Sequence, residues 1–262
     1  MDRSEVQAML AVIGDVHGCI RTLDSLVNDI EKRHGADEYI FLGDLMDRGP
    51  GDKETVDFVM EMQRYRRVSV TRGNHEDMLL DWLNGGWMYP PGQYMANGGK
   101  TTISSFTGGK FDMDLAMGKD VRESVRPYFE PYMDFLEGCI ISTGYEFPRR
   151  NYHFSHAGIG DGNGYNHRVE EYSNIDHFAF IWSRNTDSRK TPYFGYTLVH
   201  GHTPVLKLGT GVDPFTPYTN INDCGEICSI NLDTGCVYGY SLSAALIDDE
   251  GDYEFMSVRN RE

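Results

Sequence analysis

Gly14-Asp15-Val16-His17-Gly18 directly follows the apolar run at residues 9–13, and this stretch decides the fold. Two further acidic motifs, Gly43-Asp44-Leu45-Met46-Asp47-Arg48-Gly49 and Gly73-Asn74-His75-Glu76, follow apolar runs at residues 39–42 and 68–71. The motifs lie about thirty residues apart, which is the length of a strand-helix-strand unit. We therefore expect three parallel strands whose motif-bearing ends meet at one edge of a sheet, where open α/β folds bind ligands.

Apolar residues between and after these motifs recur at the spacing of amphipathic helices. This spacing predicts one helix over residues 23–30 and a second over residues 56–60. A third helix is expected over residues 76–83, because an acidic first turn precedes a broad apolar face. The chain is therefore expected to begin as β-α-β-α-β.

The second half of the chain is richer in strands. Apolar or alternating runs predict strands at residues 151–155, 197–200, 227–232, 237–240 and 244–247. Asp233-Thr234-Gly235 predicts a hairpin turn, and hence an antiparallel C-terminal section after the parallel one. The expected fold class is α/β, with two packed mixed β-sheets flanked by helices.

Length and composition indicate one globular domain. The chain has 262 residues, of which 40% are hydrophobic, and the motifs follow one another without a linker. We expect a flexible N-terminal arm at residues 1–8, a single domain over residues 9–262, and an irregular, glycine-rich surface excursion at residues 84–110. The 40 acidic against 24 basic side chains give a formal charge of −16, which disfavours extended nucleic acid as a partner.

The cysteines and the apolar runs indicate the cellular compartment in which the protein is expected. Five cysteines are sparse and odd in number, so a disulfide framework is not expected and a cytoplasmic location is favoured. The early apolar run at residues 9–13 is too short for a signal-peptide core or a membrane span. We expect no membrane partner, and the sequence does not indicate the oligomeric state.

The three motifs bring carboxylate, amide and imidazole groups into one cleft. Oxygen and imidazole ligands of this kind suit divalent metal ions, and paired ions about 3.5–4 Å apart promote displacement at phosphorus. The sequence therefore predicts two divalent metal ions. Manganese is the first expectation, and iron and zinc are open alternatives because these ligands accept all three.

Two later motifs, Ser155-His156-Ala157-Gly158 and Gly201-His202-Thr203, complete a series that resembles the PPP superfamily of metallophosphatases. The resemblance runs in the order of that family from residue 9 to residue 247. Further segments, at residues 97–102, 135–138, 182–184 and 231–236, resemble its bacterial and bacteriophage serine/threonine protein phosphatases. The resemblance implies the calcineurin-like metallophosphoesterase sandwich.

The resemblance also implies how the metal ligands divide. One ion is expected to be held by Asp15, His17 and Asp44. Asp44 bridges to the second ion, whose remaining ligands are expected to be Asn74, His156 and His202. His200, two residues before His202 on an alternating strand, is an open alternative to it.

The remaining catalytic residues are implied in the same way. His75 is expected to be the general acid that protonates the leaving group, with Asp47 as the carboxylate that orients it. Three arginines match positions that grip phosphoryl oxygens, where a planar guanidinium suits the geometry: Arg48, Arg72 and Arg184.

The implied reaction is hydrolysis of phosphate monoesters by direct attack of a metal-bridging hydroxide. A phosphoserine or phosphothreonine protein is the first expected substrate, with a small phosphoester also possible on this scaffold. The alternative is a symmetrical diadenosine tetraphosphatase, which cleaves an anhydride. A non-catalytic binding scaffold is a remote alternative, because the candidate ligand set is complete. Trp87, Tyr89 and Tyr94 could stack a nucleobase or pin the excursion to the body.

Overall fold

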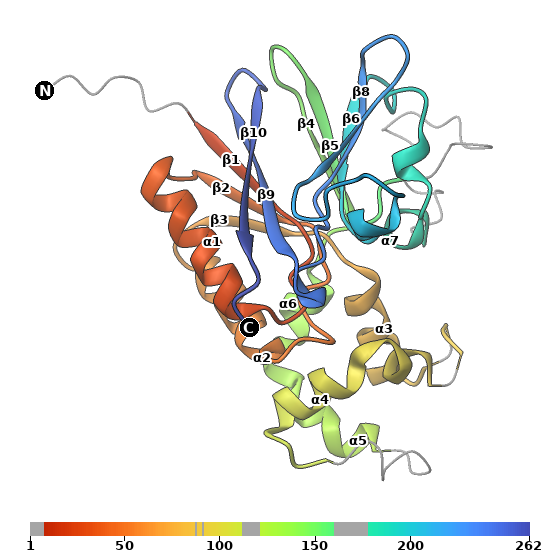
Figure 1. Cartoon of the computed structure of the whole chain (residues 1–262). Coiled ribbons are helices and arrows are strands. Elements are labelled where there is room, and N and C mark those ends of the chain that lie inside the picture. Colours follow the sequence, from red (N-terminus) through yellow and green to blue (C-terminus); the bar gives the residue numbers. More distant parts are fainter. Residues whose placement is uncertain (1–7, 87, 91, 112–120, 160–177) are drawn as a thin grey trace, which may run out of the picture.

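The computed structural model describes residues 8–86, 88–90, 92–111, 121–159 and 178–262 (Figure 1). The predicted arm lies outside these ranges except for Ala8, and Trp87 also lies outside them. Two five-stranded sheets occupy the centre, with strand orders β10-β9-β1-β2-β3 and β4-β5-β6-β8-β7. This arrangement confirms the predicted α/β fold of two mixed sheets flanked by helices.

The first sheet contains the three strands that carry the opening motifs. β1 (Met9–Ile13), β2 (Glu38–Phe41) and β3 (Arg67–Val70) pair in parallel and are joined by α1 (Ile20–Arg33) and α2 (Asp52–Met62). Their carboxyl ends therefore meet at one edge, as the motif spacing predicts. On its other side β1 pairs antiparallel with β9 (Ser241–Asp248), which forms a hairpin with β10 (Tyr253–Arg259).

The second sheet has a parallel centre and antiparallel margins. β5 (Asn151–Ser155), β6 (Tyr196–His200) and β8 (Ile227–Asn231) run parallel. β4 (Ser142–Tyr145) pairs antiparallel with β5 at one margin, and β7 (Tyr218–Ile221) pairs antiparallel with β8 at the other. The ends of β5 and β6 thus face the same way, and each is followed by a histidine motif.

The hairpin predicted at Asp233-Thr234-Gly235 is wrong. β8 belongs to the second sheet and β9 to the first, so the chain crosses between the sheets at this turn. Residues Cys236–Tyr238 form a short 3-10 helix between the left-handed Gly235 and Gly239, where a strand over residues 237–240 was expected. Gly and Asp mark a change of direction, but they do not specify which strand the chain pairs with afterwards.

The central strands of the first sheet, β9, β1 and β2, are buried on both faces. Ala11 and Ile13 of β1 face the core that α1 and α2 cover, whereas Leu10 and Val12 face the second sheet. Phe154 and Val199 of the second sheet belong to that inter-sheet core. Strands buried on both faces carry continuous apolar runs, which explains why β1 and β2 were recognisable from sequence.

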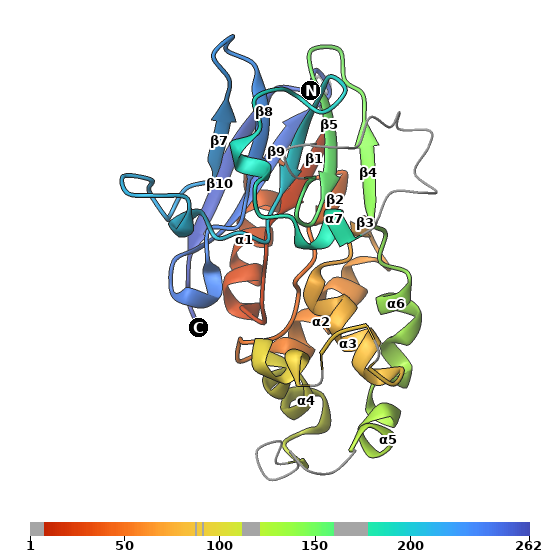
Figure 2. The same ribbon diagram turned by 90° about the vertical axis from the view of Figure 1, so that its right-hand side faces the viewer.

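Helices gather at the end of the molecule toward which the parallel strands run (Figures 1 and 2). They are α3 (Asn74–Leu83), a π-helical turn (Met95–Gly99), α4 (Lys100–Thr107), α5 (Arg122–Val125) and α6 (Met133–Glu137), with 3-10 turns at Arg126–Tyr128 and Glu130–Tyr132. α7 (Phe178–Trp182) and short 3-10 turns at Thr186–Ser188 and Val205–Lys207 accompany the second sheet.

The expectation of an irregular excursion over residues 84–110 is therefore wrong for its second half. Ile103 and Phe106 of α4 are buried in the main core, and Phe106 stacks on Phe129 with ring centroids 4.5 Å apart. Gly98, at φ 119°, breaks the regular helix immediately before α4. The glycines that suggested a loop instead provide a kink between two helical turns.

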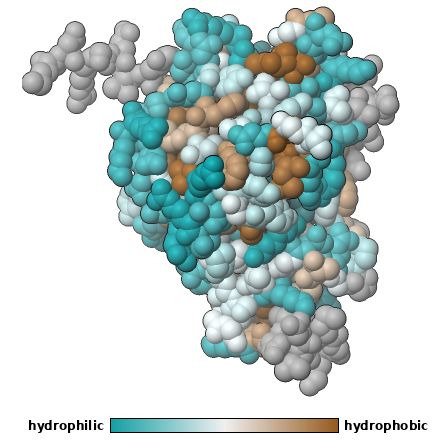
Figure 3. Space-filling view, viewed as in Figure 1, coloured by the Kyte–Doolittle hydropathy of each residue, from teal (hydrophilic) through white to brown (hydrophobic). Residues whose placement is uncertain are grey.

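The face drawn in Figure 3 is mainly hydrophilic, with hydrophobic areas interrupted by polar ones. Within the described part of the chain, no helix combines the length and the apolar character needed to cross a bilayer.

Candidate metal centre

All six predicted metal ligands lie in loops or a helix start at the ends of parallel strands. Asp15 and His17 follow β1, Asp44 follows β2, and Asn74 begins α3 after β3. The two sheets meet here, because His156 follows β5 and His202 follows β6. Each of the six side chains is buried, with at most 6% exposure. Buried polar groups need partners, so their convergence calls for hydrogen bonds or a ligand.

The backbone at this edge is strained. Six described non-glycine residues have a left-handed φ, and five of them belong to the motifs: His17, Asp44, Asp47, Arg48 and His202. Such conformations cost about 1–3 kcal/mol each and persist where the surrounding structure fixes them. Their concentration at one edge marks it as a functional site.

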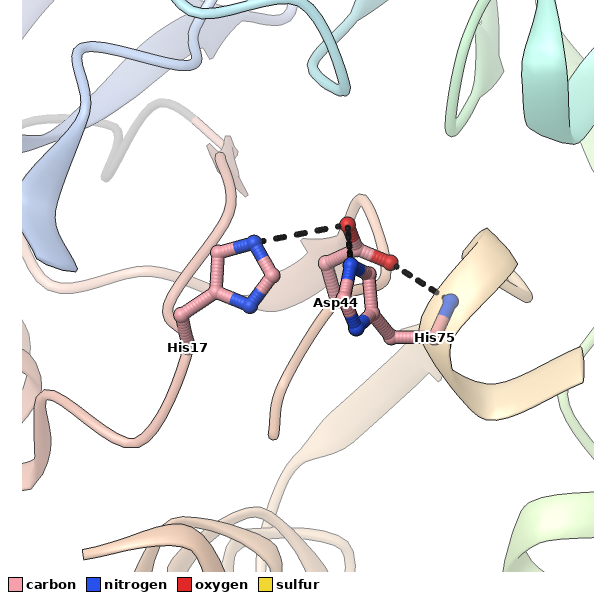
Figure 4. A group of neighbouring side chains, drawn as sticks. All are labelled: His17, Asp44 and His75. Atoms are coloured by element: carbon pink, nitrogen blue, oxygen red, sulfur yellow. Dashed lines mark hydrogen bonds and ion pairs between the residues drawn. The ribbon is translucent and has the colours of Figure 1, made fainter. Parts of the chain in front are cut away.

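Asp44 lies at the middle of the cluster, beside His17 and His75 (Figure 4). Its Oδ2 lies 3.5 Å from Nε2 of His17 and 3.8 Å from Nε2 of His75. Its Oδ1 accepts a hydrogen bond from the backbone N–H of His75 at 3.1 Å. These three side chains form one group that could hold a metal ion.

A second group shares Asp44. Nε2 of His156 lies 3.4 Å from Oδ2 of Asp44 and 3.0 Å from Oδ1 of Asn74. Nδ1 of His202 lies 2.8 Å from the same Asn74 oxygen and 3.2 Å from Nε2 of His156. Asp44, His156 and His202 form another group that could hold a metal ion. Asp44 is thus placed to bridge two sites.

The imidazoles of His17 and His156 are held so that one nitrogen faces the cluster. Nδ1 of His17 lies 2.8 Å from the carbonyl oxygen of Met46, and Nδ1 of His156 lies 2.7 Å from that of Leu42. A carbonyl accepts, so each Nδ1 carries a proton. Nε2 of His17 then presents its lone pair, and Nε2 of His156 does so once the second proton of that ring has been displaced. Metal-binding histidines in proteins are oriented by such outer hydrogen bonds.

Burial and neighbouring charges set the protonation of the cluster. Burial lowers the pKa of His17 to about 3 and lowers that of His202 well below its usual value, so both are neutral. Burial opposes ionisation of Asp44, but His156 and His75 hold its pKa well below the usual range. Asp44 in turn outweighs the burial of His156 and raises its pKa to about 10. A cation entering here must displace that proton.

The donor set fits divalent cations. Nε2 of His202 is buried and has no hydrogen-bond partner, and the Asn74 oxygen faces two imidazole nitrogens. Two neutral imidazoles, one carboxylate and one amide oxygen are a mixture that manganese, iron and zinc all accept.

Asp15 lies at the side of the two groups rather than inside either. Its carboxylate accepts the backbone N–H of His202, with the nitrogen 3.0 Å from Oδ2. Burial raises the pKa of Asp15, and the nearby Asp233 and Asp44 raise it further. Asp233 is a buried neighbour that the sequence reading did not include. A buried carboxylate near other carboxylates is stabilised in its ionised form by a cation, so Asp15 is suited to be a metal ligand.

His200 does not face the cluster. Its Nε2 lies 3.1 Å from Oδ1 of Asp187, and its Nδ1 lies 3.0 Å from the carbonyl oxygen of Gly201. His202, with its left-handed backbone, points to Asn74 and His156 instead. Of the two histidines, the structure brings His202 to the candidate centre.

His75 and Asp47 form a buried pair. Nδ1 of His75 lies 2.6 Å from Oδ2 of Asp47. Burial lowers the pKa of His75 to about 3 and raises that of Asp47 to about 8, so the pair is neutral at pH 7 and keeps two protons. One proton lies in the Nδ1–Oδ2 bond, and the other is on Nε2, which has no hydrogen-bond partner. Nε2, which lies 3.8 Å from Oδ2 of Asp44, is therefore a proton donor beside the candidate metal centre.

The three arginines are placed differently. Arg48 reaches the cluster, with one terminal nitrogen 2.8 Å from Nε2 of His17. Arg184 is exposed and close enough to lower the pKa values of His75 and His202. Arg72 turns to Asp77, 3.7 Å away, and donates to the carbonyl oxygen of Glu137 at 2.9 Å. Two guanidinium groups thus flank the cleft, and the third lies against α3 and α6.

Glu76 is a site residue whose role the sequence reading missed. Its carboxylate accepts the backbone N–H groups of Asp44, Leu45 and Gly73 at 2.8–2.9 Å. It therefore ties the loop after β2 to the start of α3. The Gly73-Asn74-His75-Glu76 motif contained this signal, because a glutamate at the third helical position commonly caps the turn before it.

Tyr89 and Tyr94 pin the excursion to the body of the molecule. The hydroxyl of Tyr89 donates to Asp77 at 2.6 Å, and that of Tyr94 donates to Asp47 at 3.2 Å. Their exposed fractions are only 8% and 3%. Neither ring is therefore exposed for stacking against a nucleobase. A different aromatic residue, Trp182, lies beside the candidate centre, edge-on to His202 with ring centroids 5.8 Å apart.

Fold and site together define a metal-dependent phosphoesterase. The sequence pattern of the family described as calcineurin-like phosphoesterase matches residues 8–234. The chain belongs to this family, which confirms the resemblance inferred from the motifs.

Similar proteins cover nearly the whole chain. A protein named asymmetrical bis(5'-nucleosyl)-tetraphosphatase PrpE, from Halalkalibacterium halodurans, is 27% identical over 270 residues, which cover 96% of this chain and 94% of the relative. A crystal structure of a putative diadenosine tetraphosphatase is 19% identical with a TM-score of 0.57, over 98% of this chain and 96% of that one. A serine/threonine phosphatase structure from Saccharomyces cerevisiae is 13% identical with a TM-score of 0.53, over 99% and 82%. At these identities the two structures show a shared fold.

Proposed function

We propose that this chain hydrolyses a phosphoanhydride bond of bis(5'-nucleosyl) tetraphosphates, with two divalent cations at the candidate metal centre. The observation that carries the proposal is the match to a tetraphosphatase over 96% of this chain and 94% of the relative. The phosphoprotein expected from sequence becomes the second candidate. A cytoplasmic location, expected from the sparse cysteines, belongs to the same proposal.

The six ligands are proposed to divide as the family resemblance implies. Asp15, His17 and Asp44 would hold one cation, and Asp44, Asn74, His156 and His202 would hold the other. When bound, the cations supply Lewis acidity and an activated water for direct displacement at phosphorus. Manganese is the metal we propose to test first, with iron and zinc after it.

The side chains around the centre bind and orient the polyphosphate. Arg48 and Arg184 flank the cleft, and their planar guanidinium groups suit phosphoryl oxygens. To join them, Arg72 must leave Asp77, 3.7 Å away, and give up its hydrogen bond to the carbonyl oxygen of Glu137. All three arginines are proposed as phosphate-binding residues, and charge that grows on the phosphoryl oxygens is the charge they stabilise.

His75 donates the proton that the leaving group needs, from Nε2, and Asp47 orients its ring. The demand for this proton depends on the substrate. An anhydride releases a phosphate oxygen, which is a weak base and leaves readily. A phosphoserine or phosphothreonine releases an alkoxide, which must be protonated. The contribution of His75 therefore reports which bond is being cleaved.

One observation favours the second candidate, a phosphoserine or phosphothreonine protein. Tyr89 and Tyr94 are buried and use their hydroxyls internally, so they do not form an aromatic wall for a nucleobase. A phosphopeptide does not require such a wall.

The test is kcat/KM of the manganese-loaded protein on diadenosine tetraphosphate and on a phosphothreonine peptide, with Asp44→Asn as the blank. A large preference for the dinucleotide supports the proposal, and a large preference for the peptide replaces it with the second candidate. Product analysis adds the position of the cut. Two molecules of ADP mark a symmetrical cut, and ATP with AMP marks an asymmetrical one. Activity on neither substrate would contradict both candidates.

A further inference from the structure

The turn at Asp47 and Arg48 carries two functions on a strained backbone. Asp47 has φ 72° and Arg48 has φ 75°, so two successive non-glycine residues are left-handed. This conformation is strained for residues other than glycine and requires contacts that hold it. Asp47 orients His75, and Arg48 reaches His17. A relaxed turn would misplace both side chains at once.

The contacts that hold this turn come from residues 94–102, which we call the clamp. The backbone N–H of Asp47 donates to the hydroxyl of Thr102 at 3.1 Å, and that of Arg48 donates to the hydroxyl of Thr101 at 2.8 Å. The hydroxyl of Thr101 in turn donates a hydrogen bond to the carbonyl oxygen of Gly98 at 2.8 Å. A Cβ at Gly98 would lie 2.9 Å from the backbone nitrogen of Arg48, so the clamp approaches the turn as closely as glycine permits.

The clamp also fixes the two side chains of the turn. Oδ1 of Asp47 accepts the hydroxyls of Thr102 and Tyr94, which leaves Oδ2 aimed at Nδ1 of His75. Nε of Arg48 donates to the carbonyl of Asn97 at 3.2 Å. Thr102 is fully buried and Tyr94 is 3% exposed, so water does not replace these donors.

We propose that Thr102 and Tyr94 are positioning residues for the proton donor, and that Thr101 and Asn97 position Arg48. The proposal rests on the proposed role of His75 as general acid. Each of the four contacts Asp47 or Arg48 rather than a metal ligand, and Thr102 also lies 3.1 Å from Oδ2 of Asp52. The clamp therefore affects proton transfer by His75 and phosphate binding by Arg48. It is not expected to affect cation binding.

Thr102→Val is the main test, because valine keeps the shape of threonine and removes its hydroxyl. Turnover is measured on p-nitrophenyl phosphate, a good leaving group, and on a phosphothreonine peptide, a poor one. We expect kcat on the peptide to fall by about tenfold to a hundredfold, as for other orienting groups. On p-nitrophenyl phosphate we expect a much smaller fall. KM and metal content by mass analysis are expected to stay at wild-type values.

Two matched variants separate positioning from packing. Thr102→Ser restores the hydroxyl and should recover most of the lost kcat. Thr107→Val removes another buried hydroxyl of α4, which donates to Ile103 rather than to Asp47, and should change neither activity. An equal loss on both substrates, or a Thr102→Ser variant as slow as Thr102→Val, would overturn the proposal.

A spectroscopic readout keeps the clamp testable if the protein turns over neither ester. The proton between Nδ1 of His75 and Oδ2 of Asp47 should give a far-downfield proton NMR signal, because the bond is 2.6 Å long. We expect that signal in the wild type and Thr102→Ser and its shift or loss in Thr102→Val. An unchanged signal in Thr102→Val would contradict the clamp, whereas inactivity of the wild type on diadenosine tetraphosphate would contradict the proposed function alone.

Discussion

Two groups of residues around the candidate metal centre differ in their hydrogen bonding. The six candidate metal ligands form the ligand side, and the clamp at residues 94–102 forms the clamp side. On the ligand side, side chains from both sheets face one another, and the buried Nε2 of His202 has no hydrogen-bond partner. On the clamp side, the hydroxyls of Tyr94, Thr101 and Thr102 each have a hydrogen-bond partner in the turn at Asp47 and Arg48. The ligand side is therefore suited to bind a cation, whereas the hydroxyls of the clamp side already have hydrogen-bond partners within the protein.

This difference separates two kinds of damage. A change on the ligand side removes a donor that a cation needs, so metal content and turnover should fall together. A change on the clamp side leaves the donors in place, so turnover should fall while metal content stays constant. Measuring both quantities for each variant turns the comparison into a test.

The largest effect is expected for Asp44→Asn, because Asp44 alone belongs to both metal groups. Replacing the shared carboxylate should lower kcat/KM by on the order of a thousandfold or more, with a loss of bound metal. Turnover and metal content by mass analysis are measured on the same sample. Asp24→Asn, an exposed carboxylate on α1, is the control. Full metal content together with wild-type turnover would contradict the bridging role.

His75→Asn should cause the next largest loss of turnover, and the size of that loss should depend on the substrate. Loss of general acid catalysis costs about a hundredfold to ten-thousandfold where the leaving group needs a proton. We expect that loss on the phosphothreonine peptide and a smaller one on diadenosine tetraphosphate, with metal content retained. His34→Asn on the surface is the control. If good and poor leaving groups suffer equally, or if metal is lost, His75 acts as a ligand, as its place in one metal group allows.

Glu76→Gln should act mainly on stability. The carboxylate of Glu76 accepts three backbone N–H groups, and the amide of glutamine would turn a donor toward at least one of them. We expect the free energy of unfolding to fall by about 2 kcal/mol in urea titrations. Glu137→Gln, an exposed residue of α6, should leave it unchanged. An unchanged midpoint in Glu76→Gln would show that the two loops are held by other contacts.

The effect that is smallest at neutral pH concerns His153, which lies on β5. Burial lowers its pKa from 6.5 to about 4. Between these pH values the unfolded chain binds a proton that the folded chain rejects, so this residue lowers stability as pH falls. The loss should reach roughly 3 kcal/mol by pH 4. The wild type minus His153→Phe difference in unfolding free energy, measured from pH 7 to pH 4, should follow this course. A difference that does not vary with pH would contradict it.

The sequence predicted the ligand side well because strand ends carry local signals. Asp15, His17 and Asp44 follow buried apolar runs, Asn74 follows the alternating β3, and the parallel topology brings such ends together. The same reasoning could not reach the clamp. Thr102 contacts Asp47 across 55 residues, and the glycines before it suggested a loop. Nothing local to either segment specifies that contact.

Edge strands were the other gap in the prediction. β4 and β7 are short, partly exposed strands with polar residues, so neither offers a continuous apolar run. β10 alternates, with Met256 and Val258 buried, and that period of two was a usable signal. The hairpin at Asp233 failed for a different reason. A turn signal reports a change of direction, and the choice between two sheets is made by packing.

The place of β1 within the first sheet has a consequence for how the chain matures during synthesis. β1 lies between β2, made soon after it, and β9, whose residues 241–248 emerge from the ribosome more than two hundred residues later. Until then one margin of β1 stays open to pairing with other chains. Contacts of such long sequence separation form slowly. The nascent protein therefore depends on protection of that margin until its C-terminal hairpin arrives.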